Sequence, residues 1–422
     1  MINEIKAYAK SKVDSYEIFF IENNINSYDF NKDGINFTNT KNSSALAIRV
    51  FLNNRIGLAS VDTLSKYKDC VETAIKIAKL NKKDEKFKSF AKPSESYKKV
   101  QVNTKELDDL QKEDIQKFIR EIIKQDIGIT EANYLKGSIK RNIVNSEGID
   151  KEDTSSFNSL SIELKDWENS LSFSTNNIFP IKIKEVQEWI ERTKNLKRKK
   201  EIKSFKGDIL FSEEVFGDLI SAPLTFNLSG ENIFYKKSKL NQLDKEVFSK
   251  KLTIRDVPLE PNKISTRSFD SEGIACKNIN LIKNGVTKNY LFDSYYGNLL
   301  NKEGGNTFRT GSSSPIIGLS NLIIEPGIKK DLIKEMDKGI FVRSLMGVHT
   351  MDQVTSNFSL AVYEGFYIEK GEIKYPLKDC MIAGNLFELL NNITEISKDQ
   401  KDTGDGWLIP KILCKGISVI GE

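Results

Sequence analysis

The chain has 422 residues, with 64 Lys and Arg against 59 Asp and Glu, which gives a formal charge of +5. This length favours two or three domains over one. Acidic and basic residues alternate closely, so the charge mainly solvates the surface and does not indicate the concentrated basic face of a nucleic-acid-binding protein. The first residues carry charges where a secretory signal would be apolar, and no stretch reaches the roughly 18 apolar residues of a membrane span. We therefore expect a cytoplasmic protein without nucleic-acid or membrane partners.

The first 200 residues predict an α/β domain. Residues 2–12 have the apolar spacing of a helix, and residues 16–21, 45–50 and 56–61 have the composition of strands. Asp62 or Thr63 is expected to cap a second helix, whose apolar stripe runs from Tyr67 to Ala78. Residues 81–100 are rich in Lys, Glu and Ser, so we interpret them as a solvated connector.

The rest of this domain predicts a β-meander with helices. Residues 114–125 have an amphipathic helical pattern, and residues 127–173 alternate apolar and polar side chains around turns such as 145–148. A short helix over residues 186–193 leads into the basic run 194–200. Because aromatic residues do not interleave with this run, we interpret it as a solvated linker at a domain boundary.

Residues 201–422 predict a second domain that is β-rich and barrel-like. The sequence changes here to short strand patterns separated by glycine turns. The clearest hairpins are residues 278–292, around Asn284-Gly285, and residues 360–377, around Lys370-Gly371. Both turn pairs suit the positive φ angles of a tight hairpin turn.

Sequence blocks in the C-terminal half occur in the order and spacing of the TldD/PmbA peptidase family. They are residues 269–273, 284–285, 291–296, 304–306, 345–347, 355–359, 365–376 and 382–386. Single blocks are weak evidence because glycine turns before strands are common, but blocks in order are much stronger. The chain therefore resembles this family, on its PmbA (TldE) side, over residues 254–392.

The resemblance allows the zinc-binding motif of catalytic family members to be compared with the matching segment of this chain. Catalytic members carry H-E-x-x-x-H on a helix, completed by a cysteine near the C-terminus, and an open coordination position holds the attacking water. In the matching segment of this chain, Gly217 and Ala222 stand in place of the histidines and Asp218 in place of the glutamate. The whole chain has one histidine, His349. We expect no zinc site here, and the resemblance implies that zinc is held by a TldD-type partner.

The resemblance implies a non-catalytic subunit of a cytoplasmic zinc-dependent peptidase that acts on unstructured peptides. It would pair with a TldD-type paralogue as a heterodimer, and the C-terminal domain is expected to supply most of the interface. The alternative is a metal-free homodimer that binds peptides or proteins without cleaving them. A nucleic-acid-associated role is disfavoured by the dispersed charge.

Three side chains are predicted to contact substrate. The glycine-rich loop 304–315 falls where the family's cavity is lined, so we expect Asn306 and Arg309 to contact extended peptide. His349 follows a glycine in a short loop, where it either contacts peptide or transfers protons, or is an ordinary hydrogen-bonded loop residue.

Two acidic residues have both a catalytic and a structural interpretation. Glu213 and Glu214 are either paired catalytic carboxylates or first-turn residues of a helix capped by Ser212, and we favour the structural interpretation. No catalytic residue is predicted in this chain. Ser356 and Asn357 stand where the family usually has a glycine and an aspartate, which puts in doubt any role assigned to that acidic position.

Overall fold

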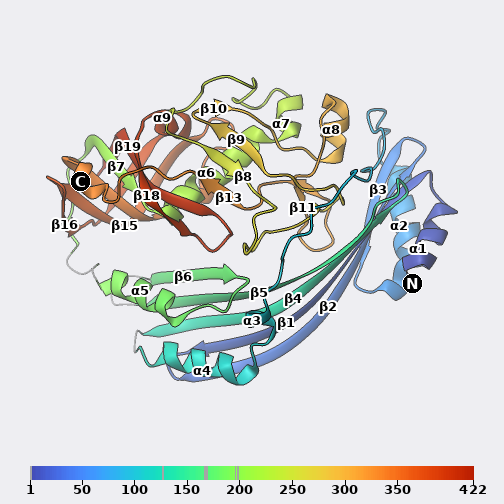
Figure 1. Ribbon diagram of the computed structural model, residues 1–422, viewed down its shortest axis with the longest axis horizontal. Helices are drawn as coiled ribbons and strands as arrows, with labels where there is room; N and C mark the ends of the chain where they lie inside the picture. Colours follow the sequence, from blue (N-terminus) through green and yellow to red (C-terminus); the bar gives the residue numbers. More distant parts are fainter. Residues whose placement is uncertain (1, 126–127, 166–169, 195, 197–198) are drawn as a thin grey trace. The chain divides into compact units, whose positions relative to one another are not determined.

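The computed structural model describes residues 2–125, 128–165, 170–194, 196 and 199–422 (Figure 1). It divides into two compact units, each assembled from separate stretches of chain. The first unit comprises Met1–Val186, Pro258–Lys277 and Leu291–Leu319, and the second comprises Gln187–Val257, Asn278–Tyr290 and Ser320–Glu422. Two segments that the sequence placed in a contiguous C-terminal domain therefore belong to the first unit.

The first unit is built on a six-stranded antiparallel sheet of order β3-β2-β1-β4-β5-β6. The strands are β1 (Ser15–Asn31), β2 (Gly34–Leu52), β3 (Arg55–Val61), β4 (Ile129–Asn145), β5 (Asp150–Lys165) and β6 (Ser170–Asn177). The predicted strands and meander are present, but β1 and β2 are much longer than expected. Their outer halves, residues 22–44, are rich in Asn, Ser and Thr and so lack the apolar alternation that identifies a strand.

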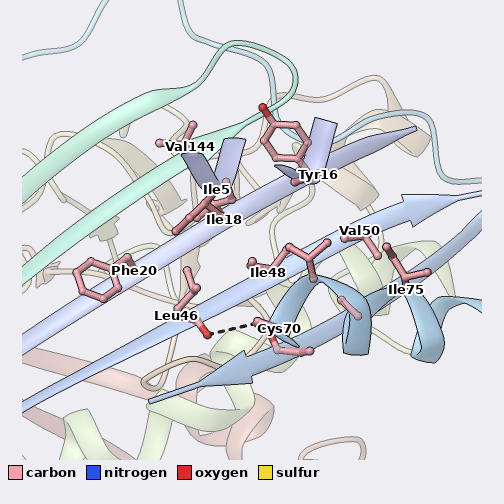
Figure 2. Packing of buried hydrophobic residues seen from close by; sticks show 14 of the residues in the cluster. Ile5, Tyr16, Ile18, Phe20, Leu46, Ile48, Val50, Cys70, Ile75 and Val144 are labelled. Carbon is pink, nitrogen blue, oxygen red and sulfur yellow. Dashed lines mark hydrogen bonds between the residues drawn. The ribbon is translucent and has the colours of Figure 1, made fainter. Parts of the chain in front are cut away.

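One end of the sheet is covered by α1 (Ile2–Lys10) and α2 (Tyr67–Leu80). Their apolar stripes pack on alternate residues of β1 and β2 to form the core in Figure 2, in which Ile18, Ile48 and Cys70 are fully buried. The stripe of α2 is the predicted one, but the predicted cap is wrong. A 3-10 turn, Leu64–Lys66, precedes the helix, and the Thr63 side chain makes no capping hydrogen bond.

The same face continues under α4 (Lys112–Ile123), where Phe118 packs edge-on against Tyr134 with ring centroids 5.8 Å apart. The opposite face carries a second core that includes Phe19, Ala91 and Phe269. Residues 81–100 have no helix or strand, as expected of a connector, yet Phe90 and Ala91 are buried. The expectation of a fully solvated connector is wrong at these two residues, because the segment supplies apolar side chains to the core. Three short elements complete the described part of this unit: α3 (Lys105–Asp108), α8 (Ser294–Leu300), and the pair β11 (Thr307–Phe308) with β12 (Ile316–Ile317).

The second unit is a closed five-stranded barrel with added strands. The barrel strands are β7 (Phe205–Phe211), β14 (Lys338–Met346), β15 (Asn357–Glu369), β17 (Cys380–Asn385) and β19 (Leu408–Ile420). Each pairs with the next in that order, and β19 also pairs with β7, which closes the ring. The added strands are β8 (Ile254–Asp256), β9 (Ile279–Lys283), β10 (Val286–Thr287), β13 (Leu322–Ile324), β16 (Glu372–Pro376) and β18 (Ile393–Asp402).

Helices of the C-terminal part are α6 (Glu213–Leu228), α7 (Gly230–Phe234) and α9 (Leu386–Asn391), while α5 (Ile183–Lys194) runs from the first unit into the second. Both predicted hairpins form, with φ of 49° at Asn284 and 51° at Lys370. The basic run 194–200 lies partly outside the described residues. Among the helices that are described, none has the length and apolarity to cross a membrane.

Candidate functional site

The first turn of α6 carries two acidic side chains at the end of barrel strand β7. Ser212 caps this helix, because its Oγ accepts a hydrogen bond from the backbone N–H of Val215 at 3.4 Å. Glu213 and Glu214 follow directly, where negative charge stabilises the positive end of the helix dipole. The predicted structural arrangement of these residues is therefore present.

Both carboxylates are paired with cations from other elements. Lys411 Nζ on β19 lies 3.0 Å from Glu213 Oε1, and Lys401 Nζ on β18 contacts Glu214 Oε1. Arg192 on α5 lies 3.5 Å from the same Glu214 oxygen. Burial alone would raise the pKa of Glu214, but the charge of Lys401 and its hydrogen bond hold that pKa at about 2. The carboxylate of Glu214 is therefore ionised at neutral pH, and its low pKa makes it a weak base.

A further ion pair joins two adjacent barrel strands nearby. Arg343 NH2 on β14 lies 2.8 Å from Glu364 Oε1 on β15, and both side chains are largely buried. Burial raises the pKa of Glu364 and lowers that of Arg343, while their opposite charges act against both shifts. The charges of Arg192 and Glu214 act on both groups, so these ion pairs form one electrostatic cluster.

Asp218, one helical turn after Glu214, is the carboxyl of this cluster with a pKa near neutrality. Burial of its carboxyl among protein atoms, together with the charges of Asp405 and Glu214, raises its pKa to about 6. Part of the side chain is nevertheless exposed to solvent. Asp405 likewise has a raised pKa, through burial and the charge of Asp402.

This helix does not offer the donors that zinc requires. Gly217 and Ala222 have no ligating atom, and the site of a Cβ at Gly217 would lie 3.6 Å from Trp407 Cε3 and 3.7 Å from Ile409 Cγ1. A side chain at position 217 would thus meet an aromatic ring and an aliphatic chain. Among the described residues, no group of three or more His, Cys, Asp or Glu side chains is arranged to hold a metal ion. These residues do not fit a zinc ion.

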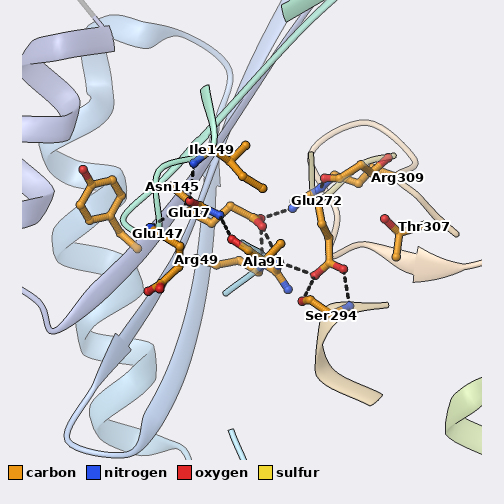
Figure 3. A network of polar contacts seen from close by, with 12 residues as sticks. Glu17, Arg49, Ala91, Asn145, Glu147, Ile149, Glu272, Ser294, Thr307 and Arg309 are labelled. Carbon is orange, nitrogen blue, oxygen red and sulfur yellow. Dashed lines mark hydrogen bonds and ion pairs between the residues drawn. The ribbon is translucent and has the colours of Figure 1, made fainter. Parts of the chain in front are cut away.

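Arg309, which the sequence predicted to contact peptide, lies in a buried ionic network of the first unit (Figure 3). Its guanidinium is paired with Glu17 on β1, and only 1% of either side chain is exposed. Arg49 on β2 joins Glu17 at 2.6 Å to Glu272 at 3.1 Å. Glu272 also accepts hydrogen bonds from the backbone N–H and the hydroxyl of Ser294, each at 2.7 Å. The guanidinium of Arg309 is therefore engaged inside the protein, and its contact with peptide stays a prediction.

Burial favours the neutral form of Glu17, yet its two arginine partners overcome this effect. Burial raises the pKa of Glu17, and the charges of Arg49 and Arg309 lower it by more, so the net shift is downward. Burial lowers the pKa of Arg309, although its partner Glu17 acts in the opposite direction. The four charges of Glu17, Glu272, Arg49 and Arg309 sum to zero, which lets the group be buried.

Asn306 precedes Arg309 by three residues in the same loop and is also buried. Its Oδ1 accepts a hydrogen bond from the N–H of Phe292 at 3.2 Å, and its carbonyl accepts one from Gly318 at 2.9 Å. The neighbouring Thr307 donates to Asp270 Oδ2 from its hydroxyl, at 2.6 Å, and from its backbone N–H, at 3.1 Å. Asn306 therefore ties the loop to Phe292 and Gly318, while Thr307 ties it to Asp270. Asn306 has a clear structural role, and its peptide contact stays a prediction.

His349 belongs to the second unit, in the 3-10 turn Val348–Thr350 that follows β14, and it is exposed. The structure brings Asn306 and Arg309 together in one loop of the first unit and places His349 on a separate turn. An exposed imidazole is open to either interpretation of this residue, so its peptide contact also stays a prediction.

Ser356, where the family usually has glycine, adopts φ +60° and is fully buried. In the described part of the chain its hydroxyl finds no hydrogen-bond partner. Its backbone N–H donates to Asp352 and its carbonyl accepts from Leu386, and glycine would keep both bonds. Removing the strained Cβ and the buried hydroxyl should outweigh the extra flexibility of unfolded glycine. We expect Ser356→Gly to raise the free energy of unfolding by about 1 kcal/mol, measured by urea denaturation.

The matched control is Ser359→Gly, three residues further along β15. Ser359 is exposed in extended strand, so glycine there should lower the free energy of unfolding by about 0.5–1 kcal/mol. Equal losses in both variants would show that residue 356 is not strained.

The ion pairs around α6 were not predicted, because their members come from six different elements of the chain. One local signal was available: Arg343 directly follows the apolar run 340–342 of β14, and Glu364 stands inside the stretch 360–368 of β15, whose other residues are apolar, aromatic or glycine. Charges at such positions are buried only when paired. That signal predicts a partner for each residue without naming it.

Comparisons with known proteins found matching family models, related sequences and similar solved structures. The family model described as the C-terminal domain of PmbA/TldA metallopeptidases matches residues 204–421, and the model for their domain 1 matches residues 16–78. An uncharacterized protein of Methanocaldococcus jannaschii is 27% identical over 414 residues, 95% of each chain. A metalloprotease PmbA homolog of Buchnera aphidicola is 32% identical over 202 residues, which cover 47% of this chain and 43% of that protein.

The crystal structure of TldE from Thermococcus kodakarensis matches this chain over its whole length. The TM-score is 0.88, with 100% of both chains covered and 24% of the residues identical. This likeness concerns the fold, and it agrees with the expected α/β N-terminal region and β-rich, barrel-like C-terminal domain.

Proposed function

The chain belongs to the TldD/PmbA metallopeptidase family, and on that premise we propose that it is a PmbA (TldE)-like, non-catalytic subunit of a zinc-dependent peptidase. The zinc is carried by a TldD-type paralogue with which this chain forms a heterodimer, and the substrates are unstructured peptides. The complex acts in the cytoplasm and involves neither nucleic acid nor a membrane.

The observation that carries this proposal is which residues helix α6 has at the positions of the zinc motif and how its acidic residues are paired. At the positions matching the zinc motif it has Gly217, Asp218 and Ala222. The acidic residues of its first turn are paired with Lys401 and Lys411. The ammonium group of Lys401 and the guanidinium group of Arg192 supply the positive charge at Glu214, so this carboxylate is paired with protein cations, which suits a subunit without its own catalytic centre.

The proposal is tested by reconstitution. The chain is purified alone and together with a TldD-type relative that contains H-E-x-x-x-H, and zinc content and cleavage of an unfolded peptide are measured for each. We expect the isolated chain to hold no stoichiometric zinc after dialysis and to cleave nothing. The two-chain complex should hold zinc and cleave the peptide, and removing zinc with a chelator should abolish cleavage.

One tightly held zinc per isolated chain, accompanied by peptide cleavage, would overturn the non-catalytic assignment. Peptide binding by the isolated chain, without cleavage and without any association with the relative, would instead favour the metal-free homodimeric binding protein.

A further inference from the structure

Arg267 is a buried arginine of the first unit that the described residues leave without an acidic partner. Only 3% of it is exposed. In the same unit, Arg49 holds Glu17 through Nε and Nη2, at 2.8 and 2.6 Å. Arg141 holds Asp153 through the same two atoms, at 2.8 and 2.7 Å. A guanidinium is rarely buried without such a partner, so Arg267 is a candidate anion-binding residue.

The hydrogen bond described for the Arg267 guanidinium is made by Nη1, which donates to the carbonyl oxygen of Thr307 at 2.8 Å. Nε is buried and, in the part of the chain that the structure describes, has no hydrogen-bond partner. Nε and Nη2 form the edge of a guanidinium that binds a carboxylate through two parallel hydrogen bonds. The bond to Thr307 therefore fixes the guanidinium through Nη1 and leaves its carboxylate-binding edge for a ligand.

The neighbouring acid Asp270 does not take the place of such a ligand. Its Oδ1 accepts hydrogen bonds from the backbone N–H groups of Glu272 and Ile274, each at 3.0 Å. Its Oδ2 accepts both hydrogen bonds from Thr307. Burial and the charge of Glu272 raise the pKa of Asp270 to about 6, and the charge of Arg267 acts against them. Asp270 thus interacts with Arg267 at a distance, while its oxygens hold the loop.

Phe308 holds the guanidinium from one face. Cζ of Arg267 lies 3.5 Å from the centroid of the Phe308 ring, which is close enough for stacking. The ring in turn is seated on Gly318, where a Cβ would lie 3.1 Å from Cδ2 of Phe308. Stacking covers a face of the guanidinium and leaves its in-plane donors free, so the Nε and Nη2 edge is held in a fixed direction.

We propose that Arg267 binds the carboxylate group of a ligand through Nε and Nη2. A carboxylate matches the planar edge of a guanidinium, and its single charge balances that of Arg267. The choice of a peptide C-terminus as the source of this carboxylate rests on the proposed function, and a small free carboxylate carries the same group. Because Nε is buried, the ligand reaches it only when the covering residues move aside. A terminal carboxylate needs a smaller opening than one within a chain.

The test is isothermal titration calorimetry of the isolated full-length chain with a short peptide of uncharged side chains and blocked N-terminus. The peptide is used with a free C-terminal carboxylate and as the C-terminal amide, and acetate and inorganic phosphate are titrated separately. We expect the acid to bind at least about tenfold more tightly than the amide. Arg267→Met should abolish this preference. Arg255→Met is the matched control, because Arg255 is already paired with Glu325 at 2.7 Å, and it should leave the preference unchanged.

Circular dichroism checks that each variant is folded. If Arg267→Met is not, Arg267→Lys decides the matter, because it keeps the charge without the planar edge and should also weaken binding of the acid. Equal affinity for acid and amide, or a preference that survives in both Arg267 variants, would overturn the proposal. Phosphate binding as tight as that of the acid would contradict a carboxylate site, and acetate binding as tight would replace the peptide by a free carboxylate. Failure of the proposed function is a separate result, because it shows as loss of zinc-dependent cleavage in the reconstitution.

Discussion

Replacing Arg309 by alanine is expected to lower the free energy of unfolding by about 3–5 kcal/mol, because it leaves a buried carboxylate without its counter-ion. Arg309 and Arg49 together neutralise Glu17 and Glu272, and both carboxylates are at most 2% exposed. Without Arg309, one guanidinium must serve two buried acids. The measurement is chemical denaturation at pH 7, followed by circular dichroism.

The double variant Arg309→Met with Glu17→Gln is the matched control, because it removes one charge of each sign and leaves Arg49 with Glu272. It should lose less stability than Arg309→Ala alone.

The pKa of Glu17 also predicts how the stability difference between wild type and Arg309→Ala changes with pH. Since the folded pKa of Glu17 is lowered, its contribution is present above the unfolded pKa of about 4.3 and is lost as the pH falls. The gap between wild type and Arg309→Ala should therefore narrow below about pH 4. An unchanged gap would contradict the assignment of the loss to this ion pair.

Because Arg309 belongs to the buried ionic network, a test of peptide contact by the loop 304–315 has to separate substrate binding from stability. A loss of peptide turnover in Arg309→Ala would be ambiguous, because the same change destabilises the first unit. The double variant, if it is as stable as expected, gives the cleaner test of whether the guanidinium contacts substrate.

Replacing Gly57 by alanine is expected to lower the free energy of unfolding by about 3 kcal/mol. Gly57 on β3 faces α2, and a Cβ built on it would lie 2.0 Å from the carbonyl oxygen of Ala74 and 2.6 Å from the backbone nitrogen of Ala78. Both atoms belong to the helix backbone, which no rotamer change can move aside, so α2 must shift off the sheet. Urea denaturation measures the loss.

Gly217→Ala is the matched control, since there the new Cβ meets only Trp407 and Ile409 at ordinary contact distances. Inside helix α6, alanine should raise the free energy of unfolding by up to about 1 kcal/mol. The same chemical change should thus have opposite effects at the two positions. A neutral Gly57→Ala would mean that α2 is less closely seated on β3 than the distances indicate.

Local patterns predicted the elements whose side chains face one core. The stripe of α2 and the hairpin turns at Asn284 and Lys370 are examples, because periodicity and positive φ are local properties. The same reasoning missed the length of β1 and β2, whose outer halves are polar and are held by pairing with neighbouring strands. Pairing partners come from other segments and leave no trace in a local window.

The candidate site was less predictable for a related reason. The capping by Ser212 and the helix-dipole role of Glu213 and Glu214 are local, and both could be predicted. Lys401 and Arg192 approach Glu214 from segments far away in the sequence, so only the fold identifies them. Arg309 was singled out from its loop, but its partner Glu17 lies 292 residues earlier in the chain.

The interleaving of the two units has a consequence for synthesis on the ribosome. Phe19 and Ala47 on the early strands pack in one cluster with Phe269 and Ile274, and the loop that carries Arg309 comes later still. The first unit therefore cannot complete its second core until about two thirds of the chain has been synthesised, and until then one apolar face of its sheet stays uncovered. A fragment that begins near residue 207 would lack the sheet of the first unit. It would still contain Pro258–Lys277 and Leu291–Leu319, which fold as part of that unit.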